Sequence, residues 1–316
     1  MCTAVRFDDN NGNMYFGRNL DWTVGYGQKI IITPRGYQYH SAFLGDMAPK
    51  AGAIIGMAIA IENTPLYFDC ANEAGLAIAG LNFPGYAQYE PTAVEGKTNV
   101  AAYEFPLWVT LNFSSVDEVE AALKNTAIVA KPISEQFPVS QLHYIIGDKN
   151  RSIVVEYTKN GMEIFSNDVD ILTNQPGYAW HQENLRNYMN LEPKKPHEVK
   201  WSKAKLTPFG SGSMMRGLPG DYYSPSRFVR VAYLNTHYPT KNTEDENVMR
   251  LFHTLTGVAM IDGAAAMDET SFEKTIYTGG YSTASKTYYY NTYENPSIVH
   301  ASLTNYDLDK SDLIQI

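Results

Sequence analysis

Cysteine is scarce in this sequence, which has only Cys2 and Cys70 among its 316 residues. Two cysteines provide no disulfide framework, so we expect a reducing compartment. Long apolar runs are missing as well. The most apolar run, 53–61, has nine residues, whereas a membrane-spanning helix needs about 20. The first residues also lack the basic and apolar regions of a secretory signal. We therefore expect neither secretion nor membrane insertion.

Positive charge is in short supply, because 25 Lys and Arg side chains stand against 34 Asp and Glu side chains. The net charge of -9 argues against nucleic-acid binding, which requires clustered cations to displace counterions from phosphates. An anionic substrate would have to be attracted by local arginines. The remaining composition, with 44% apolar, 19% charged and 13% aromatic residues, is typical of a well-packed globular chain. We interpret residues 1–316 as a single domain.

Several well-known motifs are absent or incomplete. Gly96-Lys97-Thr98 lacks the glycine that a phosphate-binding loop requires five residues earlier, where Pro91 stands. No G-x-S-x-G, H-E-x-x-H, C-x-x-C or G-x-G-x-x-G pattern occurs, so serine-hydrolase, zinc-protease and dinucleotide-binding interpretations lack their motifs. The seven histidines are scattered along the chain, and scattered histidines are usually structural or exposed.

The pattern of apolar and turn residues predicts alternating groups of strands and helices. Strands are predicted for 2–7, 14–20, 29–33, 53–61, 66–69, 76–82, 142–147, 152–157, 162–165, 169–172, 274–278, 286–290 and 298–303. Helices are predicted for 99–111, 115–123, 178–191, 227–235 and 244–255, with a capping box from Ser115 to Glu118 opening the second. Residues 192–224 are predicted to be a long surface loop. This order favours an α+β fold with two sheets stacked between helical layers.

Cys2 is the first candidate for a catalytic residue. We expect Met1 to be removed, because cysteine is a small second residue, and this leaves a thiol and a free α-amine on Cys2. A thiol with a reference pKa of about 8.5 can transfer its proton to an α-amine of about 7.7–8.0 near neutral pH. The amine can then protonate the nitrogen that leaves an amide. The alternative is that Cys2 is an ordinary early residue, just as Cys70 is interpreted as a small buried hydrophobic residue.

The predicted strand that returns beside Cys2 carries Arg18 and Asp21. Strand alternation places Arg18 and Leu20 on one face and Asn19 and Asp21 on the other, unless the strand ends or bulges near Leu20. A guanidinium beside the sulfur favours the thiolate, and a carboxylate near the α-amine orients the amine and favours its protonated form. The alternative is that Arg18 and Asp21 form a surface ion pair.

Five motifs follow one another along the whole chain: MCTAVRF, YFGRNLDW, NEAGLAIAGLNFPGY, ILTNQP and GLPGDYYSPSRFVR. Together they resemble the choloylglycine hydrolase family, in particular its bile salt hydrolases, whose close relatives are penicillin V acylases. The resemblance implies the four-layer αββα sandwich of N-terminal nucleophile hydrolases. It also implies a cytoplasmic homotetramer that requires no metal and no cofactor.

The resemblance also implies which residues are catalytic. Cys2 matches the nucleophile of the family, Arg18 the arginine beside the thiol, and Asp21 the aspartate that orients the amine. Arg227 matches the second arginine of the active site.

Two asparagines match the residues that stabilise the oxyanion in this family, namely Asn82 and Asn174. A donor placed for the oxyanion is worth roughly 3 to 4 kcal/mol. Without the resemblance, both would be interpreted as turn residues. Penicillin V acylases usually carry Tyr at the position of Asn82, which favours bile salts as the substrate.

The reaction that the resemblance implies is hydrolysis of glycine- or taurine-conjugated bile salts through a cysteine acyl-enzyme. A steroid substrate needs an apolar trough with polar groups near its amide. Candidates for this trough are Trp22, Tyr26, Met57, Ile59 and Phe137, although core packing explains each of them at least as well. Two rivals stay open: the same chemistry on penicillin V or N-acyl homoserine lactones, and a steroid- or peptide-binding protein without catalysis.

Overall fold

Two large antiparallel sheets form the centre of the computed structural model, which describes residues 1–316. The strands of the first sheet are β1 (Cys2–Asp8), β2 (Met14–Trp22), β14 (Ile171–Leu172), β17 (Ala265–Ala266), β18 (Phe272–Ser282), β19 (Thr287–Thr292) and β20 (Val299–Ser302). Their order is β14-β1-β2-β18-β19-β20, and β17 pairs with β18. The chain therefore places its first two strands at the middle of this sheet.

The second sheet is built mainly from the first half of the chain. Its strands are β3 (Lys29–Thr33), β6 (Ile54–Ile61), β7 (Thr64–Asn72), β8 (Ala77–Asn82), β11 (Leu142–Gly147), β12 (Ser152–Thr158), β13 (Gly161–Ser166) and β21 (Ile314–Gln315). Their order is β13-β12-β11-β8-β7-β6-β3-β21. Three smaller pairs are β4 (Tyr39–Ser41) with β5 (Gly45–Met47), β9 (Thr98–Ala101) with β10 (Thr126–Val129), and β15 (Val199–Trp201) with β16 (Ala204–Leu206).

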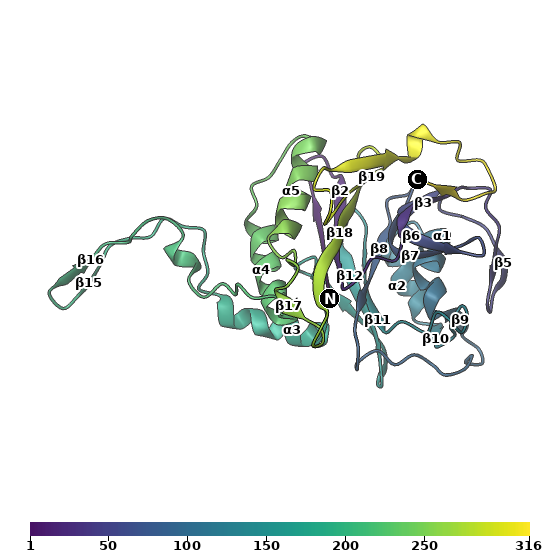
Figure 1. Ribbon diagram of the computed structural model, residues 1–316, viewed down its shortest axis with the longest axis horizontal. Helices are drawn as coiled ribbons and strands as arrows, with labels where there is room; N and C mark the ends of the chain where they lie inside the picture. The colour runs from purple at the N-terminus through teal and green to yellow at the C-terminus, as the bar shows by residue number, and fades with distance from the viewer.

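Helices cover the outer face of each sheet. They are α1 (Phe105–Asn112), α2 (Val116–Leu123), α3 (Tyr178–Asn184), α4 (Ser224–His237) and α5 (Glu244–Thr256). Short 3-10 turns are η1 (Ala102–Glu104), η2 (Leu185–Tyr188), η3 (Ser213–Met215) and η4 (Leu303–Asn305). Figure 1 shows α4 and α5 beside the first sheet and α1 and α2 beside the second, with the sheets between them. The predicted α+β arrangement of two stacked sheets between helical layers is confirmed. None of the helices is both long and apolar enough to cross a membrane.

The apolar run of β6 shows why the sheets stack. Ile55 and Met57 belong to an apolar cluster that includes residues of both sheets and of α4 and α5. Ile54 and Ala58, which alternate with them, belong to a second cluster that includes residues of α1 and α2. A strand with both faces covered needs apolar residues at every position, so this run lacks the polar alternation of a half-exposed strand.

Some predicted boundaries are wrong. The helix predicted for 99–111 begins only at Phe105, because 98–101 form β9, which pairs in parallel with β10. The helix predicted for 178–191 ends as an α-helix at Asn184 and continues as the 3-10 turn η2. The strand predicted for 169–172 is limited to β14, since Asp170 has a positive φ of 57°. The capping box of α2 is half formed: Ser115 accepts from the Glu118 N–H, but Glu118 accepts from Ser114.

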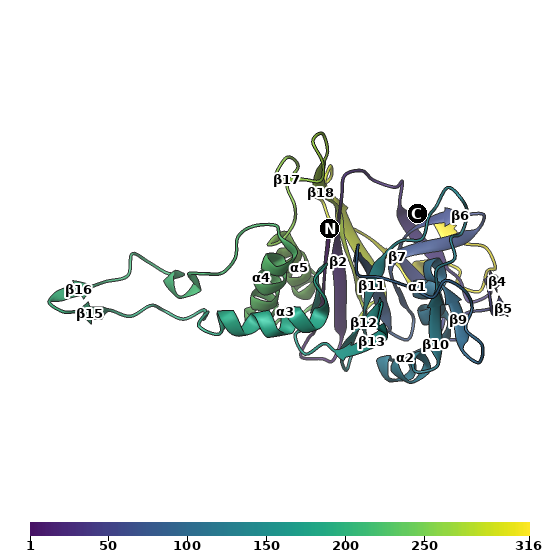
Figure 2. The ribbon, with the colours of Figure 1, turned by 90° about the horizontal axis from the view of Figure 1, so that it is seen from below.

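Residues 189–220 form an extended arm, where a long surface loop was predicted. In Figures 1 and 2 the arm leaves the body beyond α3, and the hairpin of β15 and β16 lies at its far end. Large apolar side chains on the arm are exposed, among them Met189, Trp201 and Phe209. An isolated two-stranded hairpin has no core of its own, so the arm lacks the packing that stabilises the rest of the chain.

Candidate active site

Cys2 begins β1 and lies opposite Leu20 of β2. Side chains opposite each other in an antiparallel pair share one face of the sheet, and so do residues two apart on a strand. Cys2, Leu20 and Arg18 therefore share a face. The Arg18 guanidinium is fully buried, and its Nη2 donates to Cys2 Sγ at 2.6 Å. The hairpin of the first two strands thus brings the thiol and the guanidinium together.

Backbone carbonyl groups hold the Arg18 guanidinium in position. Nη1 donates to the carbonyl oxygens of Phe68 on β7 at 3.3 Å and Gly80 on β8 at 3.1 Å. Nε donates to the carbonyl oxygen of Asn19 at 3.2 Å. Arg18 therefore reaches from the first sheet to the second. Asn19 points the other way, where its Nδ2 donates to the carbonyl oxygen of Leu255 on α5.

A buried cluster of Asp69 and two tyrosines lies beside Arg18. Burial alone would lower the pKa of Arg18, but the neighbouring Cys2, Tyr277 and Asp69 raise it above its ordinary value. Asp69 on β7 accepts hydrogen bonds from the hydroxyls of Tyr277 and Tyr288, the second at 2.6 Å. Burial raises the pKa of Asp69, while Arg18 and the two hydroxyls oppose that rise. Sequence reasoning missed this cluster, because one Asp in an apolar strand has no motif around it.

Asn174 contacts Cys2 from the opposite side. Its Oδ1 accepts from the Cys2 backbone N–H and from Arg227 Nη2, both at 2.7 Å, and its Nδ2 donates to the Asn82 carbonyl oxygen at 2.7 Å. Arg227 Nη1 donates to the Cys2 carbonyl oxygen at 2.5 Å and to Thr3 Oγ1 at 2.6 Å. Burial lowers the pKa of Arg227, which is fully enclosed near the start of α4. Hydrogen bonds therefore connect the segments of Cys2, Asn82, Asn174 and Arg227, which are distant in sequence.

Met1 extends the first strand past Cys2. Its ammonium donates to the Asp21 carbonyl oxygen at 2.7 Å and to Glu273 Oε1 at 2.9 Å, and its carbonyl oxygen accepts from the Asp21 N–H. Asp21 Oδ1 accepts from Thr275 Oγ1 at 2.6 Å, whereas the buried Oδ2 has no partner. Asp21 Oδ2 is free to accept one further hydrogen bond. Because a buried carboxylate oxygen without a donor is energetically costly, an N–H donor at this position would be stabilising.

The bulge that could have changed the faces of β2 occurs in its partner strand. Leu20 pairs with Tyr277 and Asp21 with Thr275, so Ile276 is an extra residue in β18. The register of β2 against β1 is regular from Cys2 onward. Arg18 therefore keeps the same face as Cys2.

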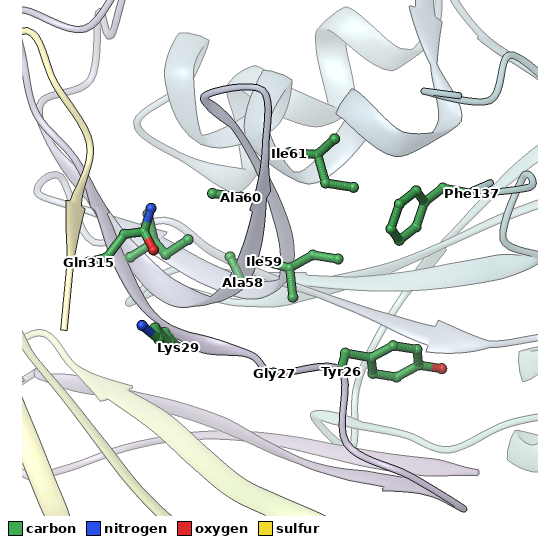
Figure 3. Close-up of a pocket in the computed structure, with 10 residues that line it drawn as sticks. Tyr26, Gly27, Lys29, Ala58, Ile59, Ala60, Ile61, Phe137 and Gln315 are labelled. Atoms are coloured by element: carbon green, nitrogen blue, oxygen red, sulfur yellow. The ribbon is translucent and has the colours of Figure 1, made fainter. Parts of the chain in front are cut away.

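A cavity of about 270 Å³ lies beside β6 and is lined mainly by apolar side chains. Tyr26, Ile59 and Phe137, three of the predicted trough residues, line it, and Figure 3 shows their side chains on one side of the cavity. Met57 is only 2% exposed and lies in the core, and Trp22 is partly buried against that core. The structure thus brings three of these five side chains together in a cavity.

Tyr26, which lines this cavity, packs on a residue that bonds to Arg18. Its ring packs on Phe68 with centroids 5.5 Å apart, and the carbonyl oxygen of Phe68 accepts a hydrogen bond from Arg18. Burial raises the pKa of Tyr26, and negative charge on Cys2 raises it further. The contacts from the lining of the cavity to Arg18 therefore pass through Phe68.

Cys70 differs from Cys2 in its surroundings. It is buried against α1, where its Sγ lies 3.6 Å from Thr110 Oγ1. Burial raises the pKa of its thiol. A thiol that stays protonated is a poor nucleophile, so Cys70 is not a candidate for catalysis.

Solved structures define the class of protein to which this fold and site correspond. The C2A mutant of conjugated bile acid hydrolase from Clostridium perfringens superposes with a TM-score of 0.93 and 38% identity, over 100% of this chain and 96% of that one. Penicillin V acylase from Agrobacterium tumefaciens shares the fold, with a TM-score of 0.77 and 19% identity over 99% and 90% of the two chains. The fold is therefore the αββα sandwich of the N-terminal nucleophile hydrolases.

Sequence comparison narrows this class to one family. Residues 2–316 match the linear amide C–N hydrolases, choloylglycine hydrolase family, and the chain belongs to that family. It is therefore an amide hydrolase. It is also 54% identical over 316 residues to a bile salt hydrolase/transferase of Bifidobacterium longum, which covers 100% of this chain and 99% of the relative. The predicted family is confirmed.

Proposed function

We propose that this protein hydrolyses the amide bond of glycine- and taurine-conjugated bile salts through an acyl-enzyme on Cys2. The observation that carries the proposal is the buried Cys2 Sγ in contact with Arg18 Nη2, at the start of a chain that is similar over its full length to a bile salt hydrolase/transferase. A guanidinium beside the sulfur favours the nucleophilic thiolate. Residues 1–316 form one domain in this proposal, and Met1 is removed in the mature chain.

Removal of Met1 is part of the proposed mechanism. With Met1 in place, Cys2 N is an amide nitrogen that donates to Asn174 Oδ1 and cannot act as a base. After removal, the same nitrogen is an α-amine that takes the thiol proton and passes it to the leaving nitrogen. The protonated amine has more hydrogens than the amide, and the unpartnered Asp21 Oδ2 is an acceptor for one of them.

Removal of Met1 is tested by intact-protein mass spectrometry of the purified chain. The expected mass is short by one methionine. A retained Met1 would contradict the mechanism, because Cys2 would then carry no amine.

Acyl transfer needs donors for the oxyanion. Attack of Cys2 Sγ on the substrate carbonyl carbon forms the S–C bond and places negative charge on the carbonyl oxygen. In the proposal, the Nδ2 group of Asn174 and the polar groups of Asn82 stabilise that oxygen. Arg227 keeps Asn174 and Cys2 aligned through its three hydrogen bonds to them and to Thr3. Breaking the C–N bond releases the amino acid, and water then hydrolyses the thioester.

The steroid is proposed to occupy the cavity lined by Tyr26, Ile59 and Phe137. Apolar side chains match the rigid ring system, while the amide reaches Cys2 at the end of the cavity where Tyr26 lies. In this proposal Met57 and Trp22 support the walls from the core.

Substrate choice is tested by measuring kcat/KM for glycocholate, taurocholate, penicillin V and an N-acyl homoserine lactone. We expect one of the two bile salts to be preferred. A preference for penicillin V or the lactone would overturn the substrate assignment, and an absence of turnover together with steroid binding would favour the non-catalytic alternative. Cys2→Ala is the control, since all turnover should depend on this thiol.

A transfer reaction is a second proposed activity, because the Bifidobacterium longum relative is named a hydrolase/transferase. In this reaction an amine attacks the thioester, so that the S–C bond breaks, a new N–C bond forms and the amine loses a proton to the Cys2 amine. Adding an excess of a free amino acid during turnover should yield the new conjugate by mass spectrometry. If only free bile acid forms at every amine concentration, the transfer proposal is wrong.

A cytoplasmic homotetramer is proposed from the family of the chain, and the arm at 189–220 supports contact between subunits. Trp201 is 73% exposed and Phe209 fully exposed, and such side chains in a single copy would face water. Large apolar side chains that are this exposed are costly in water and are often covered by a partner. A second copy of the chain would bury them and stabilise the arm.

Analytical ultracentrifugation tests this assembly. We expect a tetramer for the unmodified chain and smaller species for the double variant Trp201→Ser and Phe209→Ser. Ile261→Ser is the matched control, because Ile261 is similarly exposed but lies outside the arm. Unchanged assembly in the double variant would exclude the arm from the interface.

A further inference from the structure

Two buried histidines bond to consecutive carbonyl groups at the Asn174 loop. His143 Nε2 lies 2.8 Å from the carbonyl oxygen of Thr173, and His181 Nε2 lies 2.9 Å from the carbonyl oxygen of Asn174. Both histidines are fully buried, and they come from different elements, β11 and α3. A carbonyl oxygen only accepts, so each Nε2 carries a hydrogen. No step of the proposed reaction uses either ring.

The surroundings of His181 hold it as a neutral donor. Burial lowers its pKa to about 4, and its Nδ1 has no partner. Its ring stacks on Phe228 with centroids 4.5 Å apart and planes 11° apart. Phe228 directly follows Arg227 on α4, so His181 packs against the residue next to a predicted catalytic side chain.

His143 contacts the loop from β11 and, unlike His181, has a partner at both ring nitrogens. Its Nδ1 lies 3.1 Å from Glu156 Oε1, and this oxygen also accepts from the Tyr178 N–H at 2.9 Å. The ring stacks on Phe83 with centroids 4.0 Å apart. Phe83 directly follows Asn82.

The Asn174 side chain has little freedom to move. Its Oδ1 accepts two hydrogen bonds and its Nδ2 donates to the Asn82 carbonyl oxygen. Its backbone N–H donates to Ser224 Oγ at 2.9 Å. One side-chain amide can reach three partners only from one backbone position. A displacement of about 1 Å at such a group can cost about 100-fold in rate.

We propose that His143 and His181 are positioning residues, which clamp the carbonyl groups of Thr173 and Asn174 so that the Asn174 amide is aligned for the oxyanion. The inference rests on the proposed function of Asn174. It goes beyond that function because the two histidines act by holding the backbone of residues 173–174, without contact to the substrate.

The test compares His181→Phe with His181→Gln. Phenylalanine keeps the stack on Phe228 but has no N–H group, whereas the glutamine amide reaches the position of Nε2 and restores the donor. We expect kcat for glycocholate to fall about 10- to 100-fold in His181→Phe, with KM changed less than about threefold, because an oxyanion donor is misaligned. In His181→Gln we expect kcat within about fivefold of the unmodified enzyme.

A second measurement makes the inference independent of turnover. Amide hydrogen exchange of residues 173–178 reports the Asn174 and Tyr178 N–H groups, which are bonded to Ser224 and Glu156. We expect this segment to exchange at least about tenfold faster in His181→Phe than in His181→Gln, through local opening of the loop. Exchange of β11 residues away from the loop should stay unchanged.

The outcomes separate the two proposals. If the unmodified enzyme turns over none of the substrates but hydrogen exchange differs as expected, the proposed function is wrong. The positioning of the loop by His181 is then still supported. If exchange is the same in both variants, or if kcat falls equally in both, His181 is only a packing residue. The proposal that it positions the Asn174 loop is then wrong. Should His181→Phe not fold, His181→Asn replaces it, because its shorter amide reaches only the position of Nδ1.

Discussion

Lowering the pH from 7 to 5 should destabilise this protein through His181. Burial lowers the pKa of His181 from 6.5 to about 4 in the folded chain. In the unfolded chain the same ring has its ordinary pKa and takes up a proton below about pH 6.5. The unfolded state therefore binds more protons between pH 6.5 and 4, and the free energy of unfolding falls as the pH falls through that window.

The magnitude follows from the difference between the two pKa values. Each pH unit inside the window is worth about 1.4 kcal/mol for one proton. Between pH 7 and pH 5 the His181 contribution should fall by about 2 kcal/mol, and near pH 4 the total loss approaches 3 kcal/mol. This is a large part of the about 5 to 15 kcal/mol of stability that is typical of folded domains.

Equilibrium urea denaturation at pH 7, 6 and 5 measures this effect, with unmodified protein and His181→Gln at one protein concentration. Gln does not titrate, so subtracting the two unfolding free energies removes the contributions of all other titrating groups. The difference should shift by about 2 kcal/mol in favour of His181→Gln between pH 7 and pH 5. His197→Gln is the matched control, because His197 is exposed on the arm and should give no such shift. A constant difference for His181→Gln would refute the argument, since His181 would then titrate equally in both states.

The remaining predictions concern the thiols and the charges around them. Cys2→Ala should abolish turnover, whereas Cys70→Ala should keep it and should leave labelling by iodoacetamide unchanged, because the Cys70 thiol is buried and its pKa is raised. Arg18→Leu should slow alkylation of Cys2 at pH 7 and lower kcat/KM by about 100-fold or more, since the donor to Sγ is lost; unchanged alkylation would exclude Arg18 from thiolate stabilisation. Burial raises the pKa of Asp69 in the folded chain, so the unfolded chain releases the carboxyl proton at lower pH and the folded state loses stability as the pH rises above about 4. Asn does not titrate, so Asp69→Asn should become more stable relative to the unmodified chain between pH 4 and pH 6. Urea denaturation at these two pH values measures the difference.

Much of the fold was predictable from local sequence patterns. The β1–β2 hairpin was expected because β-type residues flank the turn-forming segment 8–13, and the structure pairs Cys2 with Leu20 as this hairpin requires. Helix α5 was expected from one apolar face, and it begins at Glu244 as predicted. The boundary at 98–104 was not predictable, because β9 exists only where β10 lies beside it in parallel. Pairing with a strand that is distant in sequence overrides the local helical preference there.

What the sequence by itself determined is the two-strand hairpin that carries Cys2 and Arg18, together with the family, because both depend on neighbouring residues and short motifs. The tertiary structure alone decided that Asp69 faces Arg18, that Asn174 reaches Cys2, and that His143 and His181 flank Asn174. His181 follows Asn174 by only seven residues, but the other pairs are separated by tens to hundreds of residues along the chain, and only the stacking of the two sheets and their helices brings those together. Hydrogen-bond partners of buried polar groups are set by that packing, since every buried donor and acceptor must find its partner among whatever side chains the fold places nearby.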